Sequence, residues 1–218
     1  MISREIRSHS HSATSTSFAS SSPTAALAAS LQKFKLGGRF NRAQQLMEQK
    51  HYQEAAALFV ALVAEEPKHE YADKALYNAA RCLESERRTD AASALYERLL
   101  AGYPASAYAD TALFRLAYHA EDAYDLGRAV ERYQLLLDKY PKSEHRKDAL
   151  YNAARGLENL QRYGEAARAF ARYAELYPEA ADAPRAQFHA AELHEKVRDG
   201  PRAVQALQEF QRRFGGRG

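Results

Sequence analysis

The 218-residue sequence has no tryptophan, a single cysteine (Cys82), seven prolines and ten glycines. One cysteine cannot form an internal disulfide, and it cannot supply a cysteine-based zinc site. The longest uninterrupted apolar run covers residues 55–64, which is too short to span a bilayer. The scarcity of turn-forming residues, together with 44 alanines, favours helices over a β-sandwich or a barrel. We therefore expect an all-α protein.

Catalytic signatures are missing as well. The sequence contains no Walker loop, no dinucleotide-binding glycine fingerprint, no nucleophile elbow and no His-Glu-x-x-His helix. Among its eight histidines, His189 and His194 are five residues apart on an expected helix. At that spacing two side chains diverge by about 140° and do not converge on a metal ion. The sequence predicts a protein that is not an enzyme and that has no catalytic residues, metal ligands or cofactor.

Positive charge is concentrated at the N-terminus. Residues 1–42 carry six basic side chains and one acidic one, so the rest of the chain is slightly acidic although the whole protein has a net charge of +3. The first thirty residues include thirteen serines and threonines and almost no large apolar side chains. Such a segment buries too little apolar area to offset its ordering entropy. We expect a disordered, serine-rich basic leader over residues 1–35 and a helical domain over residues 36–218.

A repeat of 37 residues organises that helical domain. Four prolines, Pro67, Pro104, Pro141 and Pro178, are separated by this interval. Residues 75–81 and 149–155 have the same sequence, Ala-Leu-Tyr-Asn-Ala-Ala-Arg. Several independent positions share one period, so the pattern is not an accident of composition. The recurring positions include alanine at 55, 92, 129, 166 and 203, alanine at 80, 117, 154 and 191, and an aromatic or leucine at 59, 96, 133, 170 and 207.

Each period predicts two helices. In the third period, apolar side chains recur at helical spacing over residues 107–122 and again over residues 126–139. Ser106 and Ser143 follow prolines, where we expect them to cap the N-termini of the first helices. Alanine at a fixed position in both helices allows the two backbones to approach closely, because no side chain extends past Cβ. The aromatic residue four positions later fills the space beside that contact.

This arrangement resembles the tetratricopeptide repeat family, whose helix–turn–helix unit carries two small residues, an aromatic and a proline in fixed order. Ala80, Ala92, Tyr96, Leu99 and Pro104 occupy those positions. Leucine or glutamine replaces the usual tryptophan, and the period is 37 residues instead of 34, which we interpret as one more turn on each first helix. The resemblance implies a right-handed α-α superhelix of about five repeats, starting near residues 39, 76, 113, 150 and 187.

The Tyr-Pro-x-Ser stretches and the repeat length are similar to the bacterial cell-envelope branch of this family. That branch includes the outer-membrane-assembly lipoprotein and the Tol-Pal coordinator protein. The resemblance implies a component of a bacterial multiprotein complex in the periplasm or cell envelope. The sequence shows neither the apolar stretch of a signal peptide nor a lipobox, so the cytoplasm is the alternative location.

In the resembled family the first helix of each pair lines a concave groove, and the repeat register places basic, amide and aromatic residues there. Such side chains suit an extended peptide with acidic groups or a C-terminal carboxylate. We expect a scaffold or adaptor that binds a protein partner in this groove. The plainer interpretation is solvated helix surface and tyrosine packing. The predicted groove residues are Lys74, Tyr77, Asn78 and Arg81, then Phe114, Arg115 and Tyr118, then Tyr151, Asn152 and Arg155, and finally Arg185, Phe188 and His189.

The last predicted helix has an apolar face with no following helix to cover it. Val204, Leu207, Phe210 and Phe214 recur there at helical spacing. These residues either close on themselves, contact a partner or a second copy, or pack against further repeats.

A second class of function is binding to nucleic acid or to an anionic surface, through the basic leader and the groove arginines. The remainder of the chain is slightly acidic, and the leader carries few charges for its length. Nucleic acid is therefore the weaker expectation, and a protein partner is the stronger one.

Overall fold

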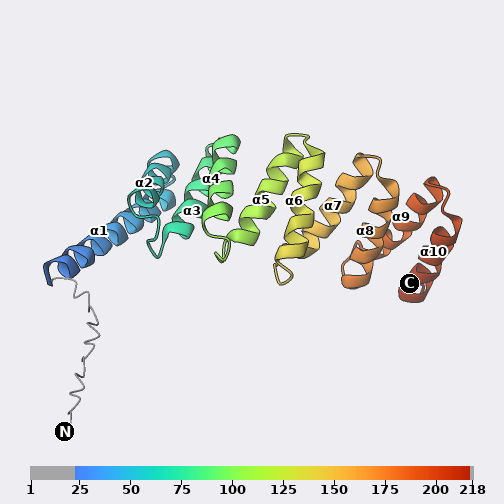
Figure 1. Ribbon diagram of the computed structural model, residues 1–218. Helices are drawn as coiled ribbons and strands as arrows, with labels where there is room; N and C mark the ends of the chain where they lie inside the picture. The colour runs from blue at the N-terminus through green and yellow to red at the C-terminus, as the bar shows by residue number, and fades with distance from the viewer. Residues whose placement is uncertain (1–22, 217–218) are drawn as a thin grey trace, which may run out of the picture.

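The computed structural model describes residues 23–216, and within them the chain forms ten α-helices. Figure 1 shows the helices arranged in one row that runs from α1 to α10. None of the helices in this part of the chain combines the length and the apolar character needed to cross a membrane. The helices are α1 (Pro23–Glu48), α2 (Tyr52–Glu65), α3 (Ala72–Ser85), α4 (Thr89–Gly102), α5 (Ala109–Asp122), α6 (Leu126–Lys139), α7 (Arg146–Asn159), α8 (Tyr163–Leu176), α9 (Ala183–Lys196) and α10 (Gly200–Phe214).

The helices pair into repeats, and each helix packs mainly against its neighbours along the chain. In the first four repeats the recurring alanines lie where the two helices of a repeat meet, and their side chains are excluded from solvent, whereas Ala203 of the last repeat is partly exposed. The recurring aromatics lie beside them and are equally buried. This pairing confirms the predicted all-α superhelix. The buried positions are Ala55, Ala92, Ala129 and Ala166, with Phe59, Tyr96, Tyr133 and Phe170.

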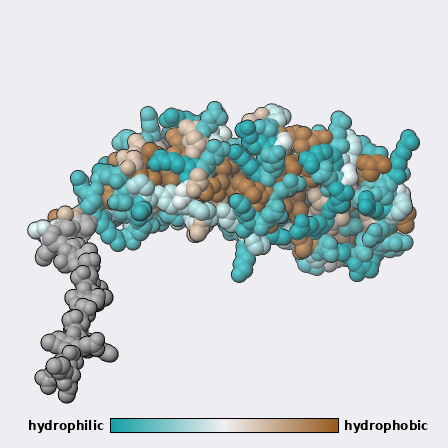
Figure 2. Space-filling model, in the orientation of Figure 1, coloured by the Kyte–Doolittle hydropathy of each residue, from teal (hydrophilic) through white to brown (hydrophobic). Residues whose placement is uncertain are grey.

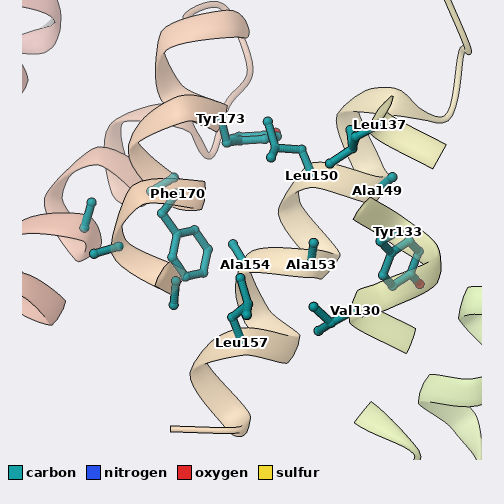
Figure 3. Close-up of a cluster of buried hydrophobic side chains, with 14 of the residues drawn as sticks. Val130, Tyr133, Leu137, Ala149, Leu150, Ala153, Ala154, Leu157, Phe170 and Tyr173 are labelled. Carbon is teal, nitrogen blue, oxygen red and sulfur yellow. The ribbon is translucent and has the colours of Figure 1, made fainter. Parts of the chain in front are cut away.

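The apolar core continues from one repeat to the next. Figure 3 shows Val130 and Tyr133 of α6 on one side of α7 and Phe170 of α8 on its other side. Between them, Ala153 and Leu157 of α7 are nearly excluded from solvent. Figure 2 shows the outer surface of this arrangement, where hydrophilic side chains cover much of the visible face and hydrophobic patches lie between them. Each repeat therefore buries its apolar faces against its neighbours, and stability is a sum of such local interfaces.

The linkers between repeats correct two expectations. The first helix of the third repeat begins at Ala109. The first helices α3, α5 and α7 have the same length as their partners, and α9 is one residue shorter than α10, so no turn is added to the first helices. The extra residues form the linker turns instead.

The linker serines are the second correction. Ser106 is not the helix N-cap, because that position is held by Tyr108, whose side chain makes no capping hydrogen bond. The Ser106 hydroxyl accepts from the Tyr108 N–H at 3.1 Å and donates to Asp73 at 2.6 Å. Ser143 accepts from His145 in the same way. These short side chains close a turn ahead of the helix, because the linker itself has backbone N–H groups to satisfy.

The turns inside the repeats place a non-glycine residue in the left-handed region. His51 N–H reaches back to Leu46 C=O, which closes the end of α1. Glycine is the usual residue at such a position, since any other residue costs about 1 kcal/mol or more in backbone strain. The low glycine content therefore does not mean a lack of tight turns. The residues with positive φ recur every 37 positions, at Lys50, Arg87, Tyr124, Gln161 and Arg198.

The N-terminal boundary also differs from the prediction. The leader was expected to extend to residue 35, whereas α1 begins at Pro23; residues 1–22 lie outside the described residues. The alanine- and leucine-rich sequence after Pro23 has high helix propensity, and it continues without interruption into the part of α1 that docks. That part buries Leu36 and Phe40. In contrast, Leu27, Leu31 and Phe34 are exposed.

Candidate functional site

The aromatic residues predicted to line the groove belong to a packed ladder. The ring of Tyr77 lies 6.1 Å from Tyr96 in its own repeat and stacks on Tyr108 at 4.7 Å. Phe114 likewise lies 5.7 Å from Tyr133 and stacks on His145 at 4.6 Å. Tyr77 and Phe114 are thus each held between the partner helix and the residue that follows the next linker. These side chains are half-buried, so packing accounts for much of their contribution.

The ladder changes at its C-terminal end. Tyr151 contacts Phe170 at 5.6 Å, but Phe188 has no following linker in the described chain and is 44% exposed, resting on Phe210 at 5.7 Å. On α10, Phe214 is buried, while Val204 and Leu207 are exposed. The predicted contact face on α10 is thus split. Two of its aromatics close on the chain itself, and two aliphatic residues face outward.

A column of glutamates, which the sequence analysis did not single out, faces the predicted basic residues. Arg115 Nε lies 2.8 Å from Glu84 on the preceding first helix, and His189 Nε2 lies 2.9 Å from Glu158. Both basic side chains are therefore occupied by an acid from the neighbouring repeat. The signal was visible as one residue type at 37-residue intervals, at Glu84, Glu121, Glu158 and Glu195.

Glu84 is also part of a partly buried polar trio. Its carboxylate lies 2.8 Å from His119 Nε2, and His119 Nδ1 lies 2.8 Å from the Ser93 hydroxyl. Burial alone would raise the pKa of Glu84, but hydrogen bonds from His119 and Arg115 lower it below its ordinary value. The order of the three side chains, hydroxyl, imidazole and carboxylate, resembles the catalytic triad of a hydrolase. However, Ser93 lies in the second turn of α4, where backbone N–H groups are bonded within the helix and form no oxyanion site. The trio holds α3, α4 and α5 together.

The predicted amide and tyrosine residues are also engaged with the protein. Asn78 is buried, and the Asn152 amide donates to the Tyr133 hydroxyl at 3.3 Å. The Arg115 guanidinium lies 5.5 Å from the centre of the exposed Tyr118 ring. The two predicted basic residues of the second repeat rest on aromatic rings. Lys74 lies over Phe40 and Arg81 over Tyr77.

Two predicted arginines remain available for a ligand. Arg155 on α7 and Arg185 on α9 are exposed, and neither has a carboxylate partner among residues 23–216. They line a cavity of about 220 Å³ between the two helices, together with Tyr151, Phe170 and His189. The cavity combines two cations with aromatic walls. Glu158 also lines it, and that carboxylate is paired with His189 at 2.9 Å. The cavity is the size of one side chain or a chain terminus, and its two arginines can hold a carboxylate by paired N–H donors.

We predict that His189 gives the fold a pH-dependent stability. Burial lowers its pKa, but hydrogen bonds to Glu192 and Glu158 outweigh that effect, and the pKa is raised above 6.5. Because the folded state binds this proton more tightly, the stabilisation is full below pH 6.5 and is lost as pH rises through the raised pKa. His189→Gln should remove at most about 1 kcal/mol at pH 6, since solvent screens the partly exposed pair. Urea unfolding of both proteins at pH 6 and pH 8 is the measurement; an equal difference at both pH values would contradict the prediction.

Comparison with known proteins places this geometry in context. Sequence models described as tetratricopeptide repeat match residues 38–116, and residues 111–143 and 148–180. No curated protein matches the chain. Among solved structures, a tetratricopeptide repeat protein from Parabacteroides merdae is 17% identical with a TM-score of 0.61, over 81% of this chain and 67% of that one. MamA from Desulfovibrio magneticus RS-1 is 14% identical with a TM-score of 0.55, over 82% and 94%. YrrB, described as having an unusual peptide-binding site, is 17% identical with a TM-score of 0.55, over 82% and 86%.

Proposed function

The chain belongs to the tetratricopeptide repeat family, and from this premise we propose that it is a non-catalytic scaffold that binds an extended segment of a protein partner between its first helices. Arrays of helical repeats offer a long continuous surface, and they use it for recognition. The segment would run across the predicted groove and would present a carboxylate to the last two repeats. That carboxylate is an acidic side chain or the C-terminus of the partner.

The observation that carries this proposal is the cavity lined by Arg155 and Arg185. Elsewhere among the predicted groove residues, Lys74 and Arg81 rest on aromatic rings. Arg115 is already paired with Glu84, so a ligand carboxylate there would have to displace an internal one. The pairing also counts against nucleic acid as the ligand, because a run of unpaired positive charge is what phosphate backbones require.

We also propose a cellular setting for this scaffold. The 37-residue period and the Tyr-Pro-x-Ser linkers support a place in a bacterial cell-envelope complex. The Tyr hydroxyls of these linkers bridge successive repeats, since Tyr103 donates to the Pro67 carbonyl at 2.6 Å and Tyr140 donates to the Pro104 carbonyl at 3.4 Å. We expect partners captured by this protein to include components of such a complex.

Affinity capture with the immobilised chain tests the binding surface. We expect Arg155→Ala/Arg185→Ala to reduce the yield of specific partners about tenfold, because two charge-assisted contacts are removed. Both residues are exposed, so circular dichroism should show unchanged helicity. Quantitative mass spectrometry of the captured proteins is the measurement.

The matched control is Arg98→Ala/Arg128→Ala, which removes two exposed arginines from second helices. It should capture the same partners at the wild-type yield. Equal yields from all three proteins would show that the cavity is not the binding site. Equal losses in both variants would show that capture depends on net charge alone.

A further inference from the structure

A second cavity lies between the second helices of the last two repeats. It has a volume of about 530 Å³, within the range of about 300–1,000 Å³ that is usual for ligand sites. Side chains of α8 and α10 form its walls, and α9 lies beneath it. It is therefore separate from the Arg155 cavity between the first helices. Its charged and polar lining includes Arg168, Arg172, Glu175, Gln187, His194, Arg202, Glu209 and Arg213.

The cations of this cavity fall into two groups. Arg213 is held by Glu209 at 3.0 Å, with Glu175 at 3.9 Å, and Arg202 is held by Asp199 at 2.8 Å. In contrast, Arg168 and Arg172 have no carboxylate partner in the described part of the chain. These two exposed arginines are four residues apart on α8 and therefore project from the same face, separated by about 6 Å along the helix axis.

The floor of this cavity is polar, whereas the floor of the preceding cavity is apolar. The preceding cavity, between α6 and α8, has Leu150 and Leu157 at the corresponding positions. Here the same positions are Gln187 and His194, which are 3% and 5% exposed. Gln187 donates to the Ala206 carbonyl at 3.0 Å, and so joins α9 to α10. The other floor residue is left with unused hydrogen-bonding capacity.

That residue, His194, has a buried Nδ1 without a hydrogen-bond partner. A buried polar atom left unpaired costs about 1–3 kcal/mol, so its retention calls for an explanation. Burial lowers the pKa of His194, Asp199 opposes this, and the charges of Arg202 and Arg168 lower it further. The imidazole beneath the arginines is therefore neutral at pH 7. It can complete a polar site without adding charge.

We propose that this cavity binds an acidic peptide segment of a protein partner, with one carboxylate on Arg168 and a second on Arg172. Side chains two residues apart on an extended peptide are about 6.6 Å apart on the same face, which matches the spacing of the two arginines. Arginine grips a carboxylate through two parallel N–H donors. Glu175 and Glu209 in the walls are already paired with Arg213, so they leave Arg168 and Arg172 to the ligand. The scaffold would then engage partners on two opposite faces of the same repeats.

The test uses the full chain carrying Arg155→Ala/Arg185→Ala, so that the cavity between the first helices does not contribute. The probe is a fluorescent peptide in which glutamate alternates with serine, and a glutamine version serves as its neutral counterpart. Fluorescence anisotropy should show binding about tenfold tighter for the glutamate peptide. Adding Arg168→Ala/Arg172→Ala should weaken it about tenfold, whereas adding Arg98→Ala/Arg128→Ala should leave it within about twofold. The ring signals of His194 in NMR spectra should shift on titration.

Four results would overturn the proposal. Equal weakening by the two arginine pairs would mean that the peptide responds to net charge. Unchanged binding in the Arg168→Ala/Arg172→Ala variant, or His194 signals that do not move, would place the peptide elsewhere. Displacement of the peptide by an equal concentration of inorganic phosphate would assign the cavity to phosphate. None of these results depends on whether the first-helix cavity binds a partner.

Discussion

Ala129→Arg should unfold the middle of the array, with a loss of stability of more than about 4 kcal/mol. Ala129 is 2% exposed at the contact between α5 and α6, where its Cβ is all that the space admits. An arginine there must either bury an unpaired charge or separate the two helices. Either change costs more free energy than the packing of α5 against α6 contributes. Because each repeat depends on its neighbours, the damage should spread along the array. Thermal unfolding followed by circular dichroism is the measurement.

The control for this substitution is Ala94→Arg. Ala94 is exposed on α4, and the corresponding position on α8 carries Arg168, so the fold already accepts arginine at that position in another repeat. The melting temperature of this variant should stay within a few degrees of the parent. Wild-type melting behaviour of Ala129→Arg would contradict the repeat register on which every helix assignment depends.

The sequence predicted the helices well because packing constraints repeat with the chain. Ala129 and Tyr133 occur at fixed places in the period, and those places are where the helices meet and fill the core. The serine of the linker was only partly understood. The serine does bond a nearby backbone N–H, as expected. However, Ser106 closes a turn that lies two residues ahead of the helix N-cap, which is Tyr108. Local propensity does not distinguish a helix cap from a turn that immediately precedes the helix.

The candidate site was less predictable, because charges pair across repeats. Arg115 reaches Glu84, which is 31 positions earlier in the chain, and a reading of single helices treats both as free. Arg115 is paired with an acid on the neighbouring repeat and Arg155 is not, and only this pairing distinguishes the two arginines. It therefore required the positions of side chains on two helices at once. The repeat register alone put both arginines in the same groove.

The joint between α6 and α7 allows a prediction about how neighbouring repeats share volume. Gly156 of α7 faces Val130 of α6, and a Cβ added at Gly156 would lie 2.6 Å from Val130 Cγ2. Figure 3 shows Val130 directed toward α7. The corresponding pair one repeat later is Ala167 with Leu193, both buried. In these two pairs a small residue on one helix is matched by a larger one on the other. The remaining pairs in these columns are Ala56 with Cys82 and Ser93 with His119.

Gly156→Leu should therefore destabilise the protein by about 3 kcal/mol, since the leucine and Val130 compete for one space. Val130→Ala alone should cost about 2 kcal/mol through the cavity that it leaves. The double variant Val130→Ala/Gly156→Leu reproduces the Ala167 and Leu193 pair, and we expect it to lie within about 1 kcal/mol of the parent.

Urea unfolding of the four proteins gives the coupling energy directly, and we expect about 3 kcal/mol or more in favour of the double variant. Leucine also has a higher helix propensity than glycine, by about 0.8 kcal/mol, so the double variant retains a small advantage from the backbone. Simple addition of the two single losses would mean that the repeats do not share volume at this joint. In that case the pairing of glycine with valine at Gly156 and Val130, and of leucine with alanine at Leu193 and Ala167, would need a cause other than packing between neighbouring repeats.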